Sequence, residues 1–361
     1  HLKGARETGS VAVPRESRQE SMNHPSAGRT GLLRVTVLLL SFVIALIAFE
    51  ITLRFTHDTP WYEGLVEEQA RNRVQRFLVG GTKFKVRRPL VETVPTASAA
   101  YRILFLGDSF TYGSGISDED SLFPTRVTRA LQQRRAEHPS ENTFAFYNGG
   151  IPGSLTRRWV TLYREGVELL NPNLVVVVFF LRDGTPQLGS IAGLAGIRDA
   201  LKRYREESFL FDHSHLYRLL VEQQKQREFG RAYFGSMQAA YLGSPAETQE
   251  WQRAQENLLA IRDDTQQRGA RFVLVIFPVL FELGDDYPLQ AVVDEIERFG
   301  VSNHIPTLSL LPAFHGEDAS ALWVSPLDQH PNARGHAIAA EAITEFLAER
   351  LPEPEDAGTE S

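Results

Sequence analysis

The sequence contains no cysteine among its 361 residues. This absence excludes a disulfide framework, a zinc site built on cysteine and a thiol nucleophile. It does not locate the protein, because a chain without cysteine is compatible with any redox compartment. A broad excess of basic residues is also lacking, since the net charge is −7 and the pI is about 5.9. A nucleic-acid partner therefore has little support.

The composition that is present is ordinary for a globular protein. Hydrophobic residues make up 42% of the chain and charged residues 23%, which argues against wholesale disorder. The length allows one large domain or two modest ones, and no internal repeat is visible. We expect only the acidic tail, residues 351–361, to be disordered.

A long apolar segment near the N-terminus runs from Gly31 to Leu53 and carries charge only at Arg34 and Glu50. About 20 apolar residues span a bilayer, and an arginine near the end of a span can reach the interface. We therefore predict a transmembrane anchor over residues 31–54. A buried core helix is the minor alternative. A cleaved signal peptide is a closer one, although no clear A-x-A site follows the apolar run.

Basic residues outnumber acidic ones ahead of this segment. The basic residues before position 35 are Lys3, Arg6, Arg15, Arg18, Arg29 and Arg34, against Glu7, Glu16 and Glu20. This bias predicts a single-pass orientation with residues 1–30 in the cytoplasm and the bulk of the chain outside it, which for a bacterial inner membrane is the periplasm. Residues 1–21 are polar and patternless, and we hypothesise that Met22 is the true initiator, so that residues 1–21 are not native.

Beyond the anchor, residues 55–100 are mixed in character and are interpreted as a stalk, with a turn at Gly80-Gly81 and a strand at 83–86. Strand and helix patterns then alternate. We predict strands at 102–106, 143–147, 174–180, 271–277 and 306–310, and helices at 120–137, 155–170, 247–268, 287–299 and 333–350. This alternation predicts a parallel sheet with helices on both faces, in a domain over residues 101–350.

Residues 186–246 interrupt the alternation. They are mostly helical in character, with aromatic residues scattered among charged ones. We interpret them as an insertion that caps or shapes a cleft. A helical surface layer is an equally good interpretation.

Ser109 directly follows the first predicted strand, within Gly107-Asp108-Ser109. In parallel sheets the active groups sit at the carboxyl ends of the strands. A serine hydroxyl becomes a nucleophile when a positioned base takes its proton, and backbone N–H groups of a tight turn can face an oxyanion. The tripeptide alone also fits a turn in which Ser109 or Asp108 caps a helix.

A second segment whose side chains could take part in catalysis lies in a predicted loop before the last helix. His330 is a candidate general base, and the carboxylate of Asp328 could orient it. Asn332 is a candidate N-cap, and His336 is expected to pack or hydrogen-bond locally. A metal site at His330 and His336 would need further ligands that cannot be nominated, so we predict neither metal nor cofactor.

Taken together, three blocks resemble the SGNH (GDSL-type) hydrolases. They are Gly107-Asp108-Ser109-Phe110-Thr111-Tyr112-Gly113, Asn148-Gly149-Gly150-Ile151-Pro152-Gly153 and Asp328-Gln329-His330-Pro331-Asn332, in the family's order across residues 100–350. The resemblance implies a flavodoxin-like three-layer α/β/α fold and ester hydrolysis or acyl transfer. It also implies Ser109 as nucleophile, Asp328 and His330 as its partners, and the N–H groups of Ser109 and Gly150 as oxyanion donors.

The sequence departs from the family pattern at two places. The third block usually reads Gly-x-Asn-Asp, but here Arg182 stands where the oxyanion-binding Asn would be. A guanidinium can donate to an oxyanion and adds positive charge, or it can pair with Asp183 or a glutamate. The commoner spacing of the last block is Asp-x-x-His, whereas this chain has Asp-x-His, as membrane-anchored and polysaccharide acetyltransferase-like relatives often do.

These features favour a membrane-anchored, extracytoplasmic serine esterase, with acyl or acetyl esters of envelope or exported polysaccharide as candidate substrates. The expected partners are this ester, carbohydrate-linked or not, and the membrane. An O-acyltransferase of the same fold is one alternative. A catalytically silent binding or assembly subunit is another, which Arg182 favours and the retention of Ser109, Asp328 and His330 opposes.

Overall fold

The computed structural model describes residues 27–56, 77–79, 82–84, 101–136, 144–186, 203, 205–325 and 328–351. It divides into two compact units, residues 1–58 and 59–361, which are considered separately. The predictions for residues 1–21, for most of the stalk, for the first part of the insertion and for the acidic tail fall outside the described residues.

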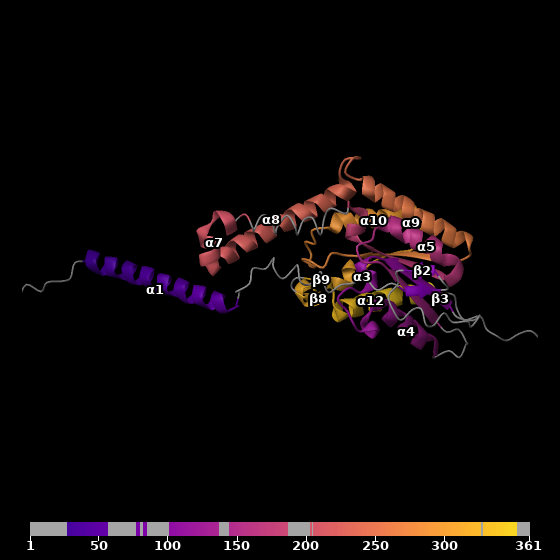
Figure 1. Ribbon diagram of the computed structural model, residues 1–361, viewed down its shortest axis with the longest axis horizontal. Coiled ribbons are helices and arrows are strands. Elements are labelled where there is room, and N and C mark those ends of the chain that lie inside the picture. Colours follow the sequence, from indigo (N-terminus) through magenta and orange to yellow (C-terminus); the bar gives the residue numbers. More distant parts are fainter. Residues whose placement is uncertain are drawn as a thin grey trace, which may run out of the picture. The chain divides into compact units, whose positions relative to one another are not determined.

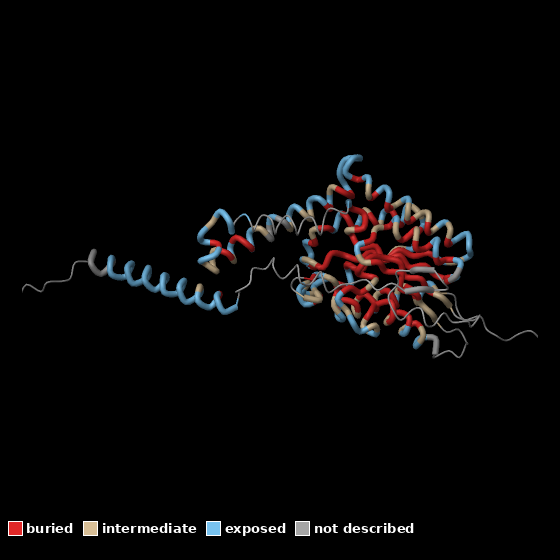
Figure 2. Tube along the Cα trace, in the orientation of Figure 1, coloured by how far each residue is buried: buried red, intermediate tan, exposed pale blue. Residues whose placement is uncertain are grey.

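The first unit contains helix α1 (Ala27–Thr56), whose side chains are exposed along nearly its whole length (Figure 2). Residues Leu32–Thr56, with a mean hydropathy of 2.6, are long and apolar enough to cross a membrane, and a signal sequence would meet the same description. The hydroxyls of Thr36, Thr52 and Thr56 donate to carbonyl oxygens one turn earlier, so they add little polarity to the helix surface.

The second unit is built on a parallel sheet, which has five strands in the described part of the chain: β3 (Tyr101–Gly107), β4 (Phe144–Gly150), β5 (Leu174–Phe180), β6 (Arg271–Phe277) and β7 (Thr307–Ser309). Their order is β4-β3-β5-β6-β7. This is the flavodoxin-like order, and it confirms the predicted fold class. All seven residues of β5 are buried, as expected for a central strand covered on both faces.

Helices cover both faces of the sheet (Figure 1). On one face α4 (Phe123–Ala136) packs against α12 (Ala333–Ala348). On the other lie α5 (Thr156–Leu170), α9 (Gln249–Gln267) and α10 (Gln290–Ser302). Helix α5 ends at Asn171, whose φ of 41° is left-handed, directly before Pro172. The predicted cap of α12 is confirmed, because Asn332 Oδ1 accepts from the N–H groups of Arg334 and Gly335.

The described part of the insertion is helical, as the sequence indicated. It contains α7 (Phe209–His213) and α8 (His215–Leu242). The C-terminal part of α8 packs on α10 and on the turn after β5, with Met237, Ala240 and Tyr241 buried. Its N-terminal part extends beyond the sheet together with α7 (Figure 1). One end of α8 is thus integrated into the core, and the other projects from it.

The remaining elements are short. Strands β1 (Phe77–Val79) and β2 (Thr82–Phe84) form an antiparallel pair. Helical turns occur at α3 (Ser109–Tyr112), η1 (Glu119–Ser121), η2 (Leu181–Gly184), α11 (Leu311–Phe314) and η3 (Ala319–Leu322). The prediction of a loop before the last helix is wrong in part, because β8 (Trp323–Ser325) and β9 (Asp328–Pro331) pair there. Asn332 supports this pairing by donating from Nδ2 to Ala321 O and Trp323 O.

Candidate active site

The candidate nucleophile lies in a sharp turn from strand to helix. Strand β3 ends at Gly107, and α3 begins at Ser109, which is only 4% exposed. Asp108 caps α3, its Oδ1 accepting from Phe110 N at 2.8 Å. A Cβ on Gly107 would lie 2.1 Å from Thr111 Oγ1, so the turn requires glycine at this position. The cap and the strand-end serine predicted for this segment are therefore both present in a single turn.

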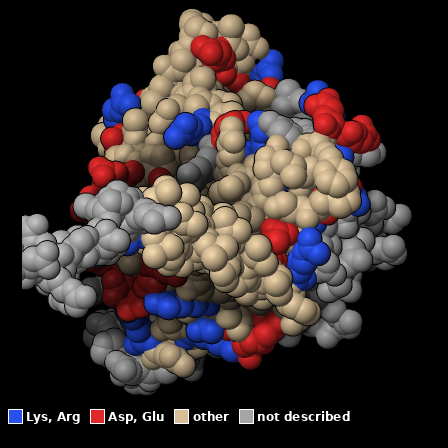
Figure 3. Space-filling model, turned by 90° about the vertical axis from the view of Figure 1, so that its left-hand side faces the viewer, with Lys and Arg blue, Asp and Glu red and all other residues tan. Residues whose placement is uncertain are grey.

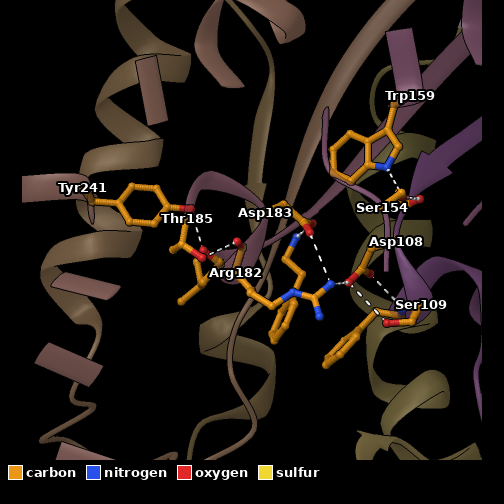
Figure 4. A network of polar contacts seen from close by, with 12 residues as sticks. Asp108, Ser109, Ser154, Trp159, Arg182, Asp183, Thr185 and Tyr241 are labelled. Carbon is orange, nitrogen blue, oxygen red and sulfur yellow. Dashed lines mark hydrogen bonds and ion pairs between the residues drawn. The ribbon is translucent and has the colours of Figure 1, made fainter. Parts of the chain in front are cut away.

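The side chains of Ser109 and Arg182 meet at one oxygen atom of Asp108 (Figure 4). Ser109 Oγ donates to Asp108 Oδ2 at 3.3 Å, and Arg182 Nη2 donates to the same oxygen at 2.9 Å. Arg182 also lies 3.8 Å from Asp183 Oδ1, a weaker approach. The guanidinium and the hydroxyl of the candidate nucleophile are therefore bridged by a single carboxylate oxygen.

Burial makes these charges strongly interdependent. Only 1% of the Asp108 side chain and 18% of the Arg182 side chain are exposed. Burial disfavours the charged guanidinium, but Asp108 and Asp183 outweigh it and raise the pKa of Arg182 above its usual value. Burial, reinforced by the negative charge of Asp108, raises the pKa of Asp183 well above the usual range of a carboxyl group. Arg182 thus stays cationic, and Asp108 is its principal counterion.

The turn that carries Arg182 is fixed by the insertion. Tyr241 of α8 donates from Oη to Leu181 O at 2.6 Å. Its ring fills the space beside Gly184, where a Cβ would lie 2.4 Å from Tyr241 Oη. Within the turn, Asp183 Oδ2 accepts from Phe180 N at 3.0 Å. No pattern in the sequence indicated this support, because Tyr241 lies 60 residues from Leu181.

The candidate base lies on β9. His330 Nδ1 is hydrogen-bonded to Asp328 Oδ1, and His330 N donates to the same oxygen at 3.1 Å. The imidazole ring lies 5.5 Å from the ring of Phe110, the residue after Ser109, and Phe110 in turn stacks on Phe180 at 4.0 Å. The structure therefore places Asp328 and His330 close to the turn that carries Ser109.

Ser109 and His330 are nevertheless not hydrogen-bonded to each other among the residues that the structure describes, since the serine hydroxyl donates to Asp108. Contacts between a nucleophile and its base are often long before substrate binds. A rotation about the Cα–Cβ bond of Ser109 is the smallest change that would redirect its hydroxyl. The catalytic roles of Ser109, Asp328 and His330 remain predictions.

Gly150 lies against the nucleophile turn, where a Cβ would be 2.2 Å from Tyr112 N. Its own N–H, however, donates to Asn148 Oδ1 at 3.0 Å. Asn148 Nδ2 in turn donates to Thr111 O at 2.9 Å, which ties β4 to α3. This position demonstrably needs a glycine for close packing, whereas its predicted use as an oxyanion donor would require exchange of the bond to Asn148.

His336 has a structural environment. It is completely buried, its Nδ1 accepts from Phe123 N at 3.2 Å, and its ring stacks on Phe123. It packs as expected, although its partner comes from α4 rather than from its own helix. The described residues contain no group of three or more histidine, aspartate or glutamate side chains placed to hold a metal ion.

The fold and the site define a class: flavodoxin-like α/β proteins with a serine at the end of the first strand and an Asp–His pair brought to it by a late segment. The model of the GDSL-like Lipase/Acylhydrolase family matches residues 105–338, and the chain belongs to this family. Curated protein sequences gave no match.

Solved structures resemble the chain at low identity. A putative lipolytic protein of the G-D-S-L family from Desulfitobacterium hafniense is 12% identical, over 68% of this chain and 99% of its own, with a TM-score of 0.40. A lipase/acylhydrolase from Enterococcus faecalis is 15% identical, over 71% and 99%, with a TM-score of 0.40. A two-domain esterase active on acetylated mannans is 17% identical, over 73% and 53%, with a TM-score of 0.42.

Proposed function

We propose that the protein is a membrane-anchored, extracytoplasmic serine esterase that hydrolyses acyl esters, with acetyl esters of envelope or exported polysaccharide as its substrates. The observation that carries the proposal is the convergence of Ser109, at the end of β3, with the hydrogen-bonded pair Asp328–His330 beside α3. Membership of an acylhydrolase family supports the reaction class.

In the proposed reaction, Ser109 Oγ attacks the ester carbonyl carbon while His330 Nε2 takes its proton. Asp328 keeps the other ring nitrogen protonated and stabilises the imidazolium. Collapse of the tetrahedral intermediate breaks the bond to the alcohol, which receives the proton from His330. Water then attacks the acyl-enzyme with His330 again as base, releasing the carboxylic acid and restoring Ser109.

The oxyanion of this intermediate would be stabilised by the N–H groups of Ser109 and Gly150 and by the Arg182 guanidinium. Arg182 is supported in this role by its hydrogen bond to the Asp108 oxygen that also accepts from Ser109. Removing one such donor typically raises the barrier by about 3–4 kcal/mol. Because Arg182 replaces the usual asparagine, Arg182→Asn should preserve or raise turnover if the arginine merely supplies a donor.

The proposed location rests on helix α1 and on the basic residues that precede it. Helix α1 is long and apolar enough to span a membrane, and basic residues predominate before it. An enzyme so anchored would meet esters of the cell envelope or of polysaccharide in export. Transfer of the acyl group to a sugar hydroxyl would use the same acyl-enzyme, so products must be compared with and without a sugar acceptor.

The test uses the full-length chain in mild detergent with 4-nitrophenyl acetate and a fluorophosphonate probe. We expect turnover and covalent labelling of the unaltered protein, and neither in Ser109→Ala. Ser114→Ala is the matched control, because Ser114 is also buried in this turn but is absent from the proposed mechanism. Activity that survived Ser109→Ala would refute the nucleophile, and an unlabelled, inactive wild-type protein would favour a silent subunit.

A further inference from the structure

A cavity of about 270 Å³ adjoins the nucleophile turn, lined by residues 151–155 together with Arg157 and Arg158. We propose that this cavity binds an anionic group of the ester substrate, a carboxylate or sulfate carried by a sugar, through the guanidinium groups of Arg157 and Arg158. The proposal rests on the proposed esterase function and adds to it the charge of the substrate.

The wall of the cavity is attached directly to the nucleophile turn. Ile151 N donates to Gly107 O at 3.0 Å, and Ser154 Oγ lies 3.5 Å from the same oxygen. Ser154 is itself fixed, because it accepts from Trp159 Nε1 at 2.8 Å. Figure 4 shows Ser154 and Trp159 next to Asp108 and Ser109. A group bound in the cavity would therefore belong to a molecule that can also reach Ser109.

The lining has positive charge without a matching negative charge. Among the described residues, neither the Arg157 nor the Arg158 side chain has an ion-pair or hydrogen-bond partner, and the first turn of α5 contains no acidic residue. Many other arginines of the chain are paired, for example Arg129 with Asp120, Arg268 with Glu168 and Arg334 with Glu317. Two guanidinium groups lining one cavity give it a positive potential, which an anionic ligand would neutralise.

No other part of the described site supplies this function. Arg182 shares an Asp108 oxygen with Ser109, but its charge is already balanced by Asp108. On the face shown in Figure 3, acidic and basic side chains are interspersed. Guanidinium groups bind carboxylate and sulfate oxygens through paired hydrogen bonds, so two of them can both bind and orient an acidic sugar.

Binding is tested first without turnover, using the full-length Ser109→Ala protein, trigalacturonate as the acidic probe and maltotriose as the neutral one. We expect calorimetry to show binding of trigalacturonate, at least tenfold weaker binding after Arg157→Ala with Arg158→Ala, and weakening by added sodium sulfate. Arg164→Ala is the matched control, because Arg164 is exposed on the same helix but does not line the cavity. Equal binding of both sugars, or unchanged affinity in the double variant, would overturn the proposal.

Turnover then separates this proposal from the esterase function. In the active protein, the double arginine variant should hydrolyse 4-nitrophenyl acetate at the wild-type rate. With acetylated trigalacturonate its kcat/KM should fall at least tenfold, chiefly through KM. An equal loss on both esters would refute a specificity role while leaving the esterase intact. Retained hydrolysis in Ser109→Ala would refute Ser109 as the nucleophile, and an inactive unaltered protein would refute the esterase function, in both cases without affecting the binding result.

Discussion

The two sides of the candidate site are built differently. The nucleophile side is buried: Ser109 begins α3, Asp108 caps it, and Arg182 lies in η2, which Tyr241 of α8 holds in place. The base side is a short antiparallel pairing of β8 and β9, and the His330 side chain is 28% exposed. One side is held by the interior of the domain, whereas the other is held by a few contacts at its surface.

This difference indicates which part adjusts when substrate binds. Buried ion pairs and packed rings resist displacement, while short surface elements open at a lower free-energy cost. In the proposed reaction, Ser109 and His330 must approach each other. We therefore expect the Ser109 hydroxyl and the β8–β9 pair to move, and the Asp108–Arg182 ion pair to remain in place.

The largest expected effect is on activity, from the base side. His330→Ala should lower kcat on 4-nitrophenyl acetate by about 10⁶-fold, as removal of the histidine of such a triad does. Because the side chain is partly exposed, the midpoint of thermal unfolding should change little. A loss of activity that was matched by a large loss of stability would break the comparison, since it would place His330 in the structural core.

The next effect is on stability, from the nucleophile side. Asp108→Asn leaves Arg182 buried without its principal counterion, which typically costs roughly 3–5 kcal/mol. We expect the lower end of this range, because Asp183 lies 3.8 Å from Arg182 and can ionise in its place. Urea unfolding of the two proteins at pH 7 measures the difference. Destabilisation no larger than that of His330→Ala would contradict the proposed asymmetry between the two sides.

The stability of the buried nucleophile side should also depend on pH, through Asp183. The pKa of Asp183 is raised above its usual value of 3.8 by burial, so the folded state holds this proton to a higher pH than the unfolded state. Stability from this group is complete below pH 3.8 and is lost as pH rises toward the raised pKa, by about 1.4 kcal/mol per pH unit. Urea unfolding between pH 4.5 and 8 should show a falling wild-type stability relative to Asp183→Asn. A difference that stayed constant with pH would show that Asp183 is ionised when folded.

The smallest effect links the insertion to catalysis. Tyr241→Phe removes the hydrogen bond to Leu181 O, worth about 1 kcal/mol, so kcat should fall about fivefold with KM unchanged. In an Arg182→Ala background the same change should have no further effect on kcat. Tyr163→Phe is the control, because that buried hydroxyl bonds to Asp264 and Thr265 instead. Additive losses of kcat in the double variant would assign Tyr241 a purely structural role.

Much of the fold was predictable because buried parallel strands consist of consecutive apolar residues. Residues 174–180 and 271–277 were predicted as strands with the bounds that β5 and β6 have. Strand β9 was missed because its sequence, Asp-Gln-His-Pro, is too short and too polar to show the alternation of a strand. Its pairing with β8 is supported by the hydrogen bonds of Asn332 to Ala321 O and Trp323 O, which the residue types of this segment do not reveal.

The candidate site divides in the same way. By itself, the sequence determined that Ser109 follows a strand, that Asp328 and His330 are spaced to interact, and that Arg182 follows the central strand, because these features depend on local order along the chain. Only the tertiary structure decided that Arg182 pairs with Asp108, 74 residues away, and that Tyr241 supports its turn. Such partners are chosen by burial, which leaves a cation no stable alternative to the nearest carboxylate, and burial is a property of the folded chain alone.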